Sequence, residues 1–188
     1  KMIEAELDND AIPDDIKAEP RMHYIFAATL THDEITGQIY TDLTGRFPQQ
    51  SSHGNKYVLV LYDYDSNAIL AQPIKNRSDA ETIQAYDALI KILLQRGLTP
   101  KLQRLDNEAS KALKSYLHEQ QIDFQLVPPH VHRRNAAERA IRTFKNHFIA
   151  GLCSTDKHFP LHLWDRLIEQ ATITLNLLRT SRINPKLS

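Results

Sequence analysis

The run Lys56–Tyr62 (Lys-Tyr-Val-Leu-Val-Leu-Tyr) constrains the fold of this chain most, because it is apolar at successive positions and rich in β-formers. Such a run is typical of a strand that is buried on both faces. Gln38–Phe47 before it and Ala68–Ile74 after it also predict strands. The intervening segments Ser51–Asn55 and Asp63–Asn67 have the composition of turns. Three strands joined in this way predict an antiparallel meander.

The second half of the chain alternates between helical and strand patterns. Ser78-Asp-Ala-Glu81 is a capping box that begins a helix, and Gly97 ends it. Lys101–Leu105 and Asp123–Val127 predict a fourth and a fifth strand, with a helix at Ala109–Gln120 between them. Two further helices are expected from Asn135 and from about Pro160. The residues expected to face the core from the three longer helices are Ile83, Tyr86, Ile90, Leu93 and Leu94; Ala137, Ile141, Phe144, Phe148 and Leu152; and Trp164, Leu167, Ile168, Ala171, Leu175 and Leu178.

This order of elements predicts the fold class. Strand-helix-strand units require parallel crossovers, whereas the meander is antiparallel, so the sheet is expected to be mixed. Helices of this number cover both faces of such a sheet. The expected architecture is therefore α/β, a five-stranded mixed sheet flanked by helices, which matches the ribonuclease-H-like fold.

Composition predicts one domain with an acidic lead-in. A chain of 188 residues suffices for one full core. Residues 1–20 are acidic and are expected to be a flexible lead-in, and residues 21–188 are expected to form the domain. No apolar run is long enough for a membrane span, which predicts a soluble intracellular protein. The single cysteine, Cys153, excludes a multi-cysteine zinc site and is expected to be buried near a helix end.

Three carboxylates fall at related places in the predicted fold. Asp42 lies in the first strand, Asp106 at the end of the fourth, and Glu138 in the first turn of the helix after the fifth. If the first and fourth strands are neighbours, the three can form a cluster. Three carboxylates within about 4 Å of one another repel by roughly 4 kcal/mol per pair, so they require protons or cations. Oxygen ligands without thiolates favour Mg²⁺ or Mn²⁺, and two such ions can activate a hydroxyl and stabilise the leaving oxygen of a phosphodiester.

Basic residues surround Glu138 and can position a phosphate backbone. They are Arg133, Arg134, Arg139, Arg142 and Lys145. Each signal also has a structural interpretation. Glu138 can complete a capping box with Asn135 or pair with Arg142, and the basic residues can form a solvated face. Asp42 can be an exposed strand residue and Asp106 a turn residue.

Several segments together resemble a known family. Tyr40–Gly45 (Tyr-Thr-Asp-Leu-Thr-Gly), Leu105–Ser110 (Leu-Asp-Asn-Glu-Ala-Ser) and Pro128–Arg139 resemble the three signature blocks of retroviral-type integrase catalytic cores. Phe159–Arg166 resembles the helix that follows the catalytic one. The resemblance covers roughly Gln38 to Ser188 and is nearest to the integrases of copia-type retrotransposons, particularly those of diatoms.

The resemblance implies a DNA strand transferase with Asp42, Asp106 and Glu138 as the triad that binds Mg²⁺ or Mn²⁺. Such enzymes trim element DNA ends with water and then join the 3′-hydroxyls to target DNA. It further implies a piece of a polyprotein, retroelement DNA ends and target DNA as partners, a homo-oligomer, and action in the nucleus. Two departures stand out: 31 residues separate Asp106 from Glu138, a few fewer than is usual, and Arg133-Arg134-Asn135 replaces a Gln-Gly-type segment. Both predict a shorter, stiffer and more basic loop.

Two alternatives remain open from the sequence. The first is a ribonuclease H or related nuclease, which would need a fourth carboxylate; Glu81 and Asp87 are the local candidates. The second is a catalytically inactive nucleic-acid-binding or assembly domain. Its DNA binding would depend steeply on salt and would not change when the carboxylates are replaced.

Overall fold

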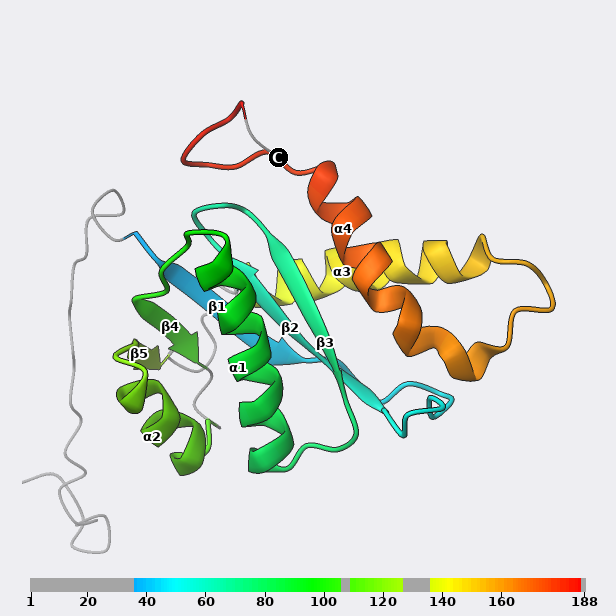
Figure 1. Cartoon of the computed structure of the whole chain (residues 1–188), viewed down its shortest axis with the longest axis horizontal. Helices are drawn as coiled ribbons and strands as arrows, with labels where there is room; N and C mark the ends of the chain where they lie inside the picture. The colour runs from blue at the N-terminus through cyan, green and yellow to red at the C-terminus, as the bar shows by residue number, and fades with distance from the viewer. Residues whose placement is uncertain (1–35, 106–108, 127–135, 187–188) are drawn as a thin grey trace, which may run out of the picture. The chain divides into compact units, whose positions relative to one another are not determined.

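A five-stranded mixed sheet forms the centre of the molecule (Figure 1). The structure is a computed structural model, which describes residues 36–105, 109–126 and 136–186. The strand order is β3-β2-β1-β4-β5. The first three strands form the predicted antiparallel meander, and β4 and β5 continue the sheet in parallel with β1. The strands are β1 (Gln38–Leu43), β2 (Tyr57–Asp63), β3 (Ile69–Ile74), β4 (Leu102–Leu105) and β5 (Asp123–Leu126).

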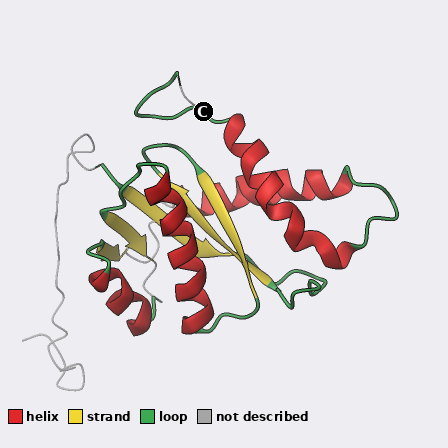
Figure 2. Cartoon of the chain, in the orientation of Figure 1, coloured by secondary structure: helices red, strands yellow, loops and turns green. Residues whose placement is uncertain are grey.

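Helices cover both faces of the sheet, as predicted (Figure 2). They are α1 (Asp79–Gln95), α2 (Lys111–Glu119), α3 (Ala136–Cys153), the 3-10 helix η4 (Leu161–Leu167) and α4 (Ile168–Leu177). The side chain of Ser78 caps α1 by accepting a hydrogen bond from Glu81 N. Gly97 follows the last turn with φ +74°, a value that glycine adopts without strain.

The alternation of side chains along β1 and β2 divides the core into two clusters. Ile39, Leu59 and Leu61 point toward α1 and α2. Tyr40 and Val60 point the other way, toward α3 and α4. Since Asp42 lies two residues after Tyr40, it belongs to the face of the sheet on which α3 packs.

The first strand is shorter than predicted, ending at Leu43, so Asp42 lies near its end and not in its middle. The chain after it leaves the regular ladder, although Phe47 N still donates to Lys56 O at 2.8 Å. Phe47 instead stacks on Trp164 with 4.2 Å between the ring centroids. This tertiary contact between distant segments is what the local alternation could not predict.

Most predicted core positions are confirmed, with three exceptions. Leu94 is 49% exposed and Leu178 is 79% exposed, because the first lies on the outer side of α1 and the second follows the end of α4. Cys153 is the last residue of α3, as expected, but it is exposed and not buried. The segment from Pro160 also differs, because it begins as the 3-10 helix η4 before α4 starts. Ala137 lies among the side chains that the structure leaves undescribed.

The end of α4 covers the outer edge of β3. The Asn176 side chain donates to Ile69 O at 2.8 Å and accepts from Ile69 N at 2.9 Å. These are two of the outward-facing backbone groups of β3 to which a sixth strand could bond. An edge strand that is capped in this way is less available for pairing with another chain.

Within the described ranges, none of the helices combines the length and the apolar character that crossing a membrane requires. The predicted boundary between residues 1–20 and residues 21–188 lies outside the described residues and stays a prediction.

Candidate active site

Asp42 is exposed near the carboxyl end of β1. It lies opposite Val60 of β2, and its Oδ1 atom accepts a hydrogen bond from Leu43 N at 2.7 Å. Its neighbour on the same face, Tyr40, is buried. Asp42 therefore lies at the boundary between the part of this face that is buried and the part that is exposed to solvent.

The parallel pairing of β1 with β4 brings a second chain segment to this place. Tyr40 lies opposite Arg104, and the Arg104 guanidinium carbon is 5.8 Å from the centre of the Tyr40 ring. Arg104 therefore shares the α3 face with Tyr40 and Asp42. Leu105 is the last described residue of β4, and the predicted site residue Asp106 lies outside the described residues.

Glu138 lies in the first turn of α3, as predicted, and is exposed. Ala140, Ile141 and Phe144 anchor this helix in the core on the same face of the sheet as Tyr40. The helix packs on β1 and β2 of the sheet and on α4. An acid in a first helical turn is also stabilised by the positive end of the helix dipole, so the position alone does not define a ligand.

The predicted triad stays a prediction. Within the part of the chain that the structure describes, no three His, Cys, Asp or Glu side chains are grouped so that they could hold a metal ion. Since Asp106 is not among those residues, this finding does not bear on the triad. The structure brings Asp42 and the helix that carries Glu138 to one face of the sheet.

The predicted basic surface is described in part. Arg139 and Arg142 are exposed on α3, whereas Lys145 is half-buried. Arg133 and Arg134 lie outside the described residues. Both exposed arginines follow Glu138 within four residues, and their exposure leaves them accessible to a polyanion.

The two candidates for a fourth carboxylate have structural partners. Glu81 Oε2 accepts from Lys75 N at 3.2 Å, beside the start of α1. Asp87 accepts from the Tyr116 hydroxyl at 3.0 Å and pairs with Lys91 at 2.6 Å. The hydrogen bond from Lys91 is the main cause that lowers the pKa of Asp87. These contacts explain both acids without a nuclease site.

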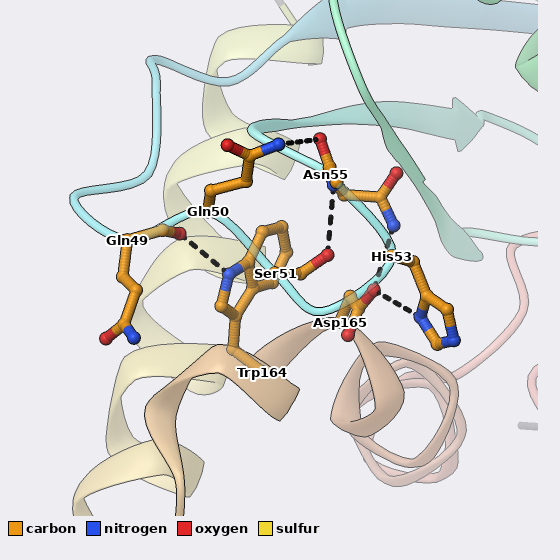
Figure 3. A network of polar contacts seen from close by, with 8 residues as sticks. Gln49, Gln50, Ser51, His53, Asn55, Trp164 and Asp165 are labelled. Atoms are coloured by element: carbon orange, nitrogen blue, oxygen red, sulfur yellow. Dashed lines mark hydrogen bonds and ion pairs between the residues drawn. The ribbon is translucent and has the colours of Figure 1, made fainter.

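A polar network fixes the connection between β1 and β2 (Figure 3). The buried Asp165 of η4 accepts from His53 Nδ1 and Asn55 Nδ2, both at 2.8 Å. The neighbouring Trp164 donates from Nε1 to Gln49 O at 2.9 Å. Sequence reasoning missed this network. The signal that points to it is an acid beside the core residue Trp164, since an acid in such a place needs donors.

Hydrogen bonds determine the charge state of Asp165. Burial by itself would raise its pKa, but the hydrogen bonds from Ser51, His53 and Asn55 outweigh burial and hold the pKa of Asp165 below its ordinary value. A lowered pKa in the folded state means that the carboxylate stabilises the fold above the pKa of the unfolded chain, about 3.9. This stabilisation is lost as the pH falls through the folded pKa.

We therefore expect Asp165→Asn to be less stable than the unmodified chain by about 1–3 kcal/mol at pH 7, because a charged acceptor is lost. The difference should shrink as the pH falls from about 5 to below 4. Urea unfolding at a series of pH values measures it. Glu119→Gln, which alters an exposed acid of α2, is the control and should follow the unmodified chain. A difference that stays constant down to pH 2 contradicts this account.

The fold is similar to that of retroviral integrase catalytic cores. The HTLV-2 integrase catalytic core in complex with magnesium, in its dimeric form, has a TM-score of 0.59 and 20% identity over 81% of this chain and 94% of that chain. The BIV integrase catalytic core has a TM-score of 0.58 and 17% identity over 78% and 87%. The sequence matches no family model and no curated protein.

A chain of the simian T-cell lymphotropic virus intasome, solved with the PP2A regulatory subunit B56γ, has a TM-score of 0.62 and 19% identity. The match covers 77% of this chain, which spans only half the length of that one. These similarities establish the fold. The predicted α/β, ribonuclease-H-like class is confirmed, with the five-stranded mixed sheet and flanking helices of an integrase catalytic core.

Proposed function

We propose that the chain is the catalytic core of a DNA strand transferase of the integrase type, in which Asp42, Asp106 and Glu138 bind divalent cations. The single observation that carries this proposal is the parallel pairing of β1 with β4, which sets Tyr40 opposite Arg104. The signature segments around the three carboxylates favour a copia-type retrotransposon integrase. The similarity in fold to integrase cores supports the same assignment.

The register leads from the described residues to the proposed site. Asp42 and Asp106 each follow one member of the Tyr40–Arg104 pair by two residues. Side chains two residues apart point to the same face of a sheet. If β4 continues for one more step, the two aspartates would come side by side on the face where α3 packs.

The chemistry of the donors fits Mg²⁺ or Mn²⁺. Carboxylate oxygens are the ligands these ions prefer, and the cations would relieve a repulsion of roughly 4 kcal/mol per close carboxylate pair. When bound, two such ions activate the attacking hydroxyl and stabilise the leaving oxygen of a phosphodiester. The role of the chain itself would be to hold Asp42 on β1 and Glu138 on α3. The exposed Arg139 and Arg142 would orient the phosphate backbone beside them.

The structural neighbours support the choice of partners. One was solved with magnesium, and another belongs to an intasome. We propose retroelement DNA ends and target DNA as the substrates of this chain, Mg²⁺ as its cofactor, and the nucleus as its place of action. A polyprotein origin is proposed from the resemblance of the signature segments to retrotransposon integrases.

Strand transfer tests the proposal. The chain is incubated with Mn²⁺ and a labelled duplex that represents an element end, together with plasmid target. Joined products that require the divalent ion are the expected result. Preferential cleavage of RNA in a hybrid duplex would instead identify a ribonuclease H. The chain can also be tested with integrase domains added on both sides. If it binds DNA in both forms but catalyses no metal-dependent reaction in either, it is an inactive binding domain.

We also propose that the chain self-associates through α4. Ile173 is 44% exposed and Leu177 is 65% exposed, and they lie one turn apart on one side of this helix. HTLV-2 integrase cores were solved in dimeric and trimeric forms.

Sedimentation velocity tests this self-association, and the unmodified chain should sediment as an oligomer. The double variant Ile173→Lys with Leu177→Lys should sediment as a monomer. The control Leu161→Lys, on η4, should leave the oligomer intact. A monomeric unmodified chain at 100 µM, roughly the range of crystallisation, would contradict self-association.

A further inference from the structure

One row of side chains crosses the sheet on its α3 face. The strand register places Tyr62 opposite Tyr40, Tyr40 opposite Arg104, and Arg104 opposite Gln125. The row lies two residues before Asp42 along β1, a separation of about 7 Å. The helices on this face make their main contacts with the first three strands, α3 with β1 and β2 and α4 with β3. Arg104 and Gln125 lie beyond those strands, toward the β5 edge.

Arg104 has a polar atom that no described residue satisfies. Its Nε atom is buried and, among the described residues, has no hydrogen-bond partner. The Oε1 atom of Gln125, which lies opposite Arg104 on β5, is also buried and has no hydrogen-bond partner among the described residues. A buried polar group without a partner costs about 1–3 kcal/mol, and more when it is charged. Such a pair in one place indicates a site that is completed by something outside the described chain.

The other arginines that lie over tyrosine rings do have partners. Arg179 Nε donates to Asn67 O at 2.6 Å, and Arg182 donates to the Tyr62 hydroxyl at 2.8 Å. Arg77 lies 4.8 Å from the centre of the Tyr57 ring and donates to Thr44 O at 3.3 Å. Each of these arginines ties loops or strand ends together, so its position has a structural reason. Arg104 also lies over a tyrosine ring, at 5.8 Å from its centre, but no hydrogen bond joins its Nε atom to any of the described residues.

A phosphate fits this arrangement. The Arg104 guanidinium carbon lies over the Tyr40 ring at 5.8 Å from its centre, and a planar guanidinium binds two oxygens of one phosphate at once. We propose that Arg104 binds a phosphate of the DNA backbone, one row of the sheet away from Asp42, and so positions the strand beside the carboxylates. This role rests on the proposed function, since it requires that DNA binds to the α3 face of the sheet as the substrate.

The competing structural explanation is that Arg104 and Gln125 satisfy each other after a small rotation of either side chain. It predicts that replacing Gln125 and replacing Arg104 have similar effects on stability and none on DNA binding. The phosphate role predicts that only the loss of Arg104 changes DNA binding, and that the change carries the signature of a lost ionic contact.

Fluorescence anisotropy with a labelled duplex separates the two explanations. Binding is measured in EDTA from 50 to 200 mM salt for the unmodified chain, Arg104→Gln, Gln125→Leu and Arg77→Gln. The slope of log K against log salt should fall in magnitude by about 1 for Arg104→Gln, because one phosphate contact contributes about 0.9. Arg77→Gln removes an equal charge from an arginine–tyrosine pair elsewhere and should keep the original slope, as should Gln125→Leu.

An unchanged slope for Arg104→Gln overturns the proposal, and so does the absence of DNA binding by the unmodified chain at 50 mM salt. Thermal unfolding of each variant verifies the fold. If Arg104→Gln does not fold, Arg104→Lys keeps the charge and loses the planar fork, so its slope should persist while its affinity falls several-fold. An unchanged affinity of Arg104→Lys overturns the proposal as well.

The metal-free readout keeps this proposal distinct from the proposed chemistry. A reduced slope together with failed strand transfer leaves the phosphate contact in place and removes the strand-transferase assignment. An unchanged slope together with successful strand transfer removes the phosphate contact and leaves the strand-transferase assignment in place.

Discussion

Asp42→Asn is expected to lower the rate of Mn²⁺-dependent strand transfer by about 10³-fold or more, which corresponds to about 4 kcal/mol of lost transition-state stabilisation. The neutral amide loses the charge that holds a divalent ion. Because Asp42 is exposed, the substitution should leave the thermal unfolding midpoint nearly unchanged. Turnover is measured with a labelled element-end duplex and plasmid target.

Asp156→Asn serves as the matched control, since Asp156 is an exposed acid in the loop that follows α3. It should transfer strands as the unmodified chain does. If Asp42→Asn keeps full turnover in Mn²⁺, Asp42 is not a metal ligand and the proposed triad is wrong.

Trp164→Ala is expected to lower the free energy of unfolding by about 3–5 kcal/mol, the usual cost of removing a large buried aromatic side chain. Trp164 is buried and stacks on Phe47, and its ring meets Phe148 edge to face at 6.4 Å. The substitution also leaves Gln49 O without its donor. Urea unfolding followed by circular dichroism measures the loss.

Leu161→Ala on the same 3-10 helix is the control for Trp164, because Leu161 is 56% exposed. Its effect should stay within about 0.5 kcal/mol. A loss of less than 1 kcal/mol for Trp164→Ala, well under the usual range, would show that η4 does not anchor the connection between β1 and β2.

Local patterns were sufficient for the sheet. The unbroken apolar run of β2 predicted a strand that is buried on both faces, and all its residues from Val58 to Asp63 are buried. The capping box at Ser78 and the glycine at position 97 defined α1, since both act within one helical turn. The strand-helix-strand order predicted that the sheet is mixed, with parallel strands after the meander. These features depend on neighbours in sequence, which is why the sequence was informative about them.

Contacts between distant segments could not be predicted in this way. His53 and Asp165 are 112 residues apart, and no periodicity relates them. The exposure of Cys153 and Leu178 depends on where a helix ends relative to the sheet, which helical spacing does not define. Of the candidate site, the sequence predicted that Asp42 lies in the first strand and Glu138 in the first turn of a helix. It did not predict Arg104, because the burial of its Nε atom without a hydrogen-bond partner among the described residues is a property of the packed sheet.

The most direct test of the central claim is a crystal structure of this chain soaked in Mn²⁺, with the ion located by its anomalous scattering. We expect at least one ion with oxygen ligands from Asp42, Asp106 and Glu138 at about 2.0–2.3 Å. Carboxyl groups more than about 8 Å apart, with no ion bound between them, would contradict the triad, because one ion cannot reach ligands at that separation.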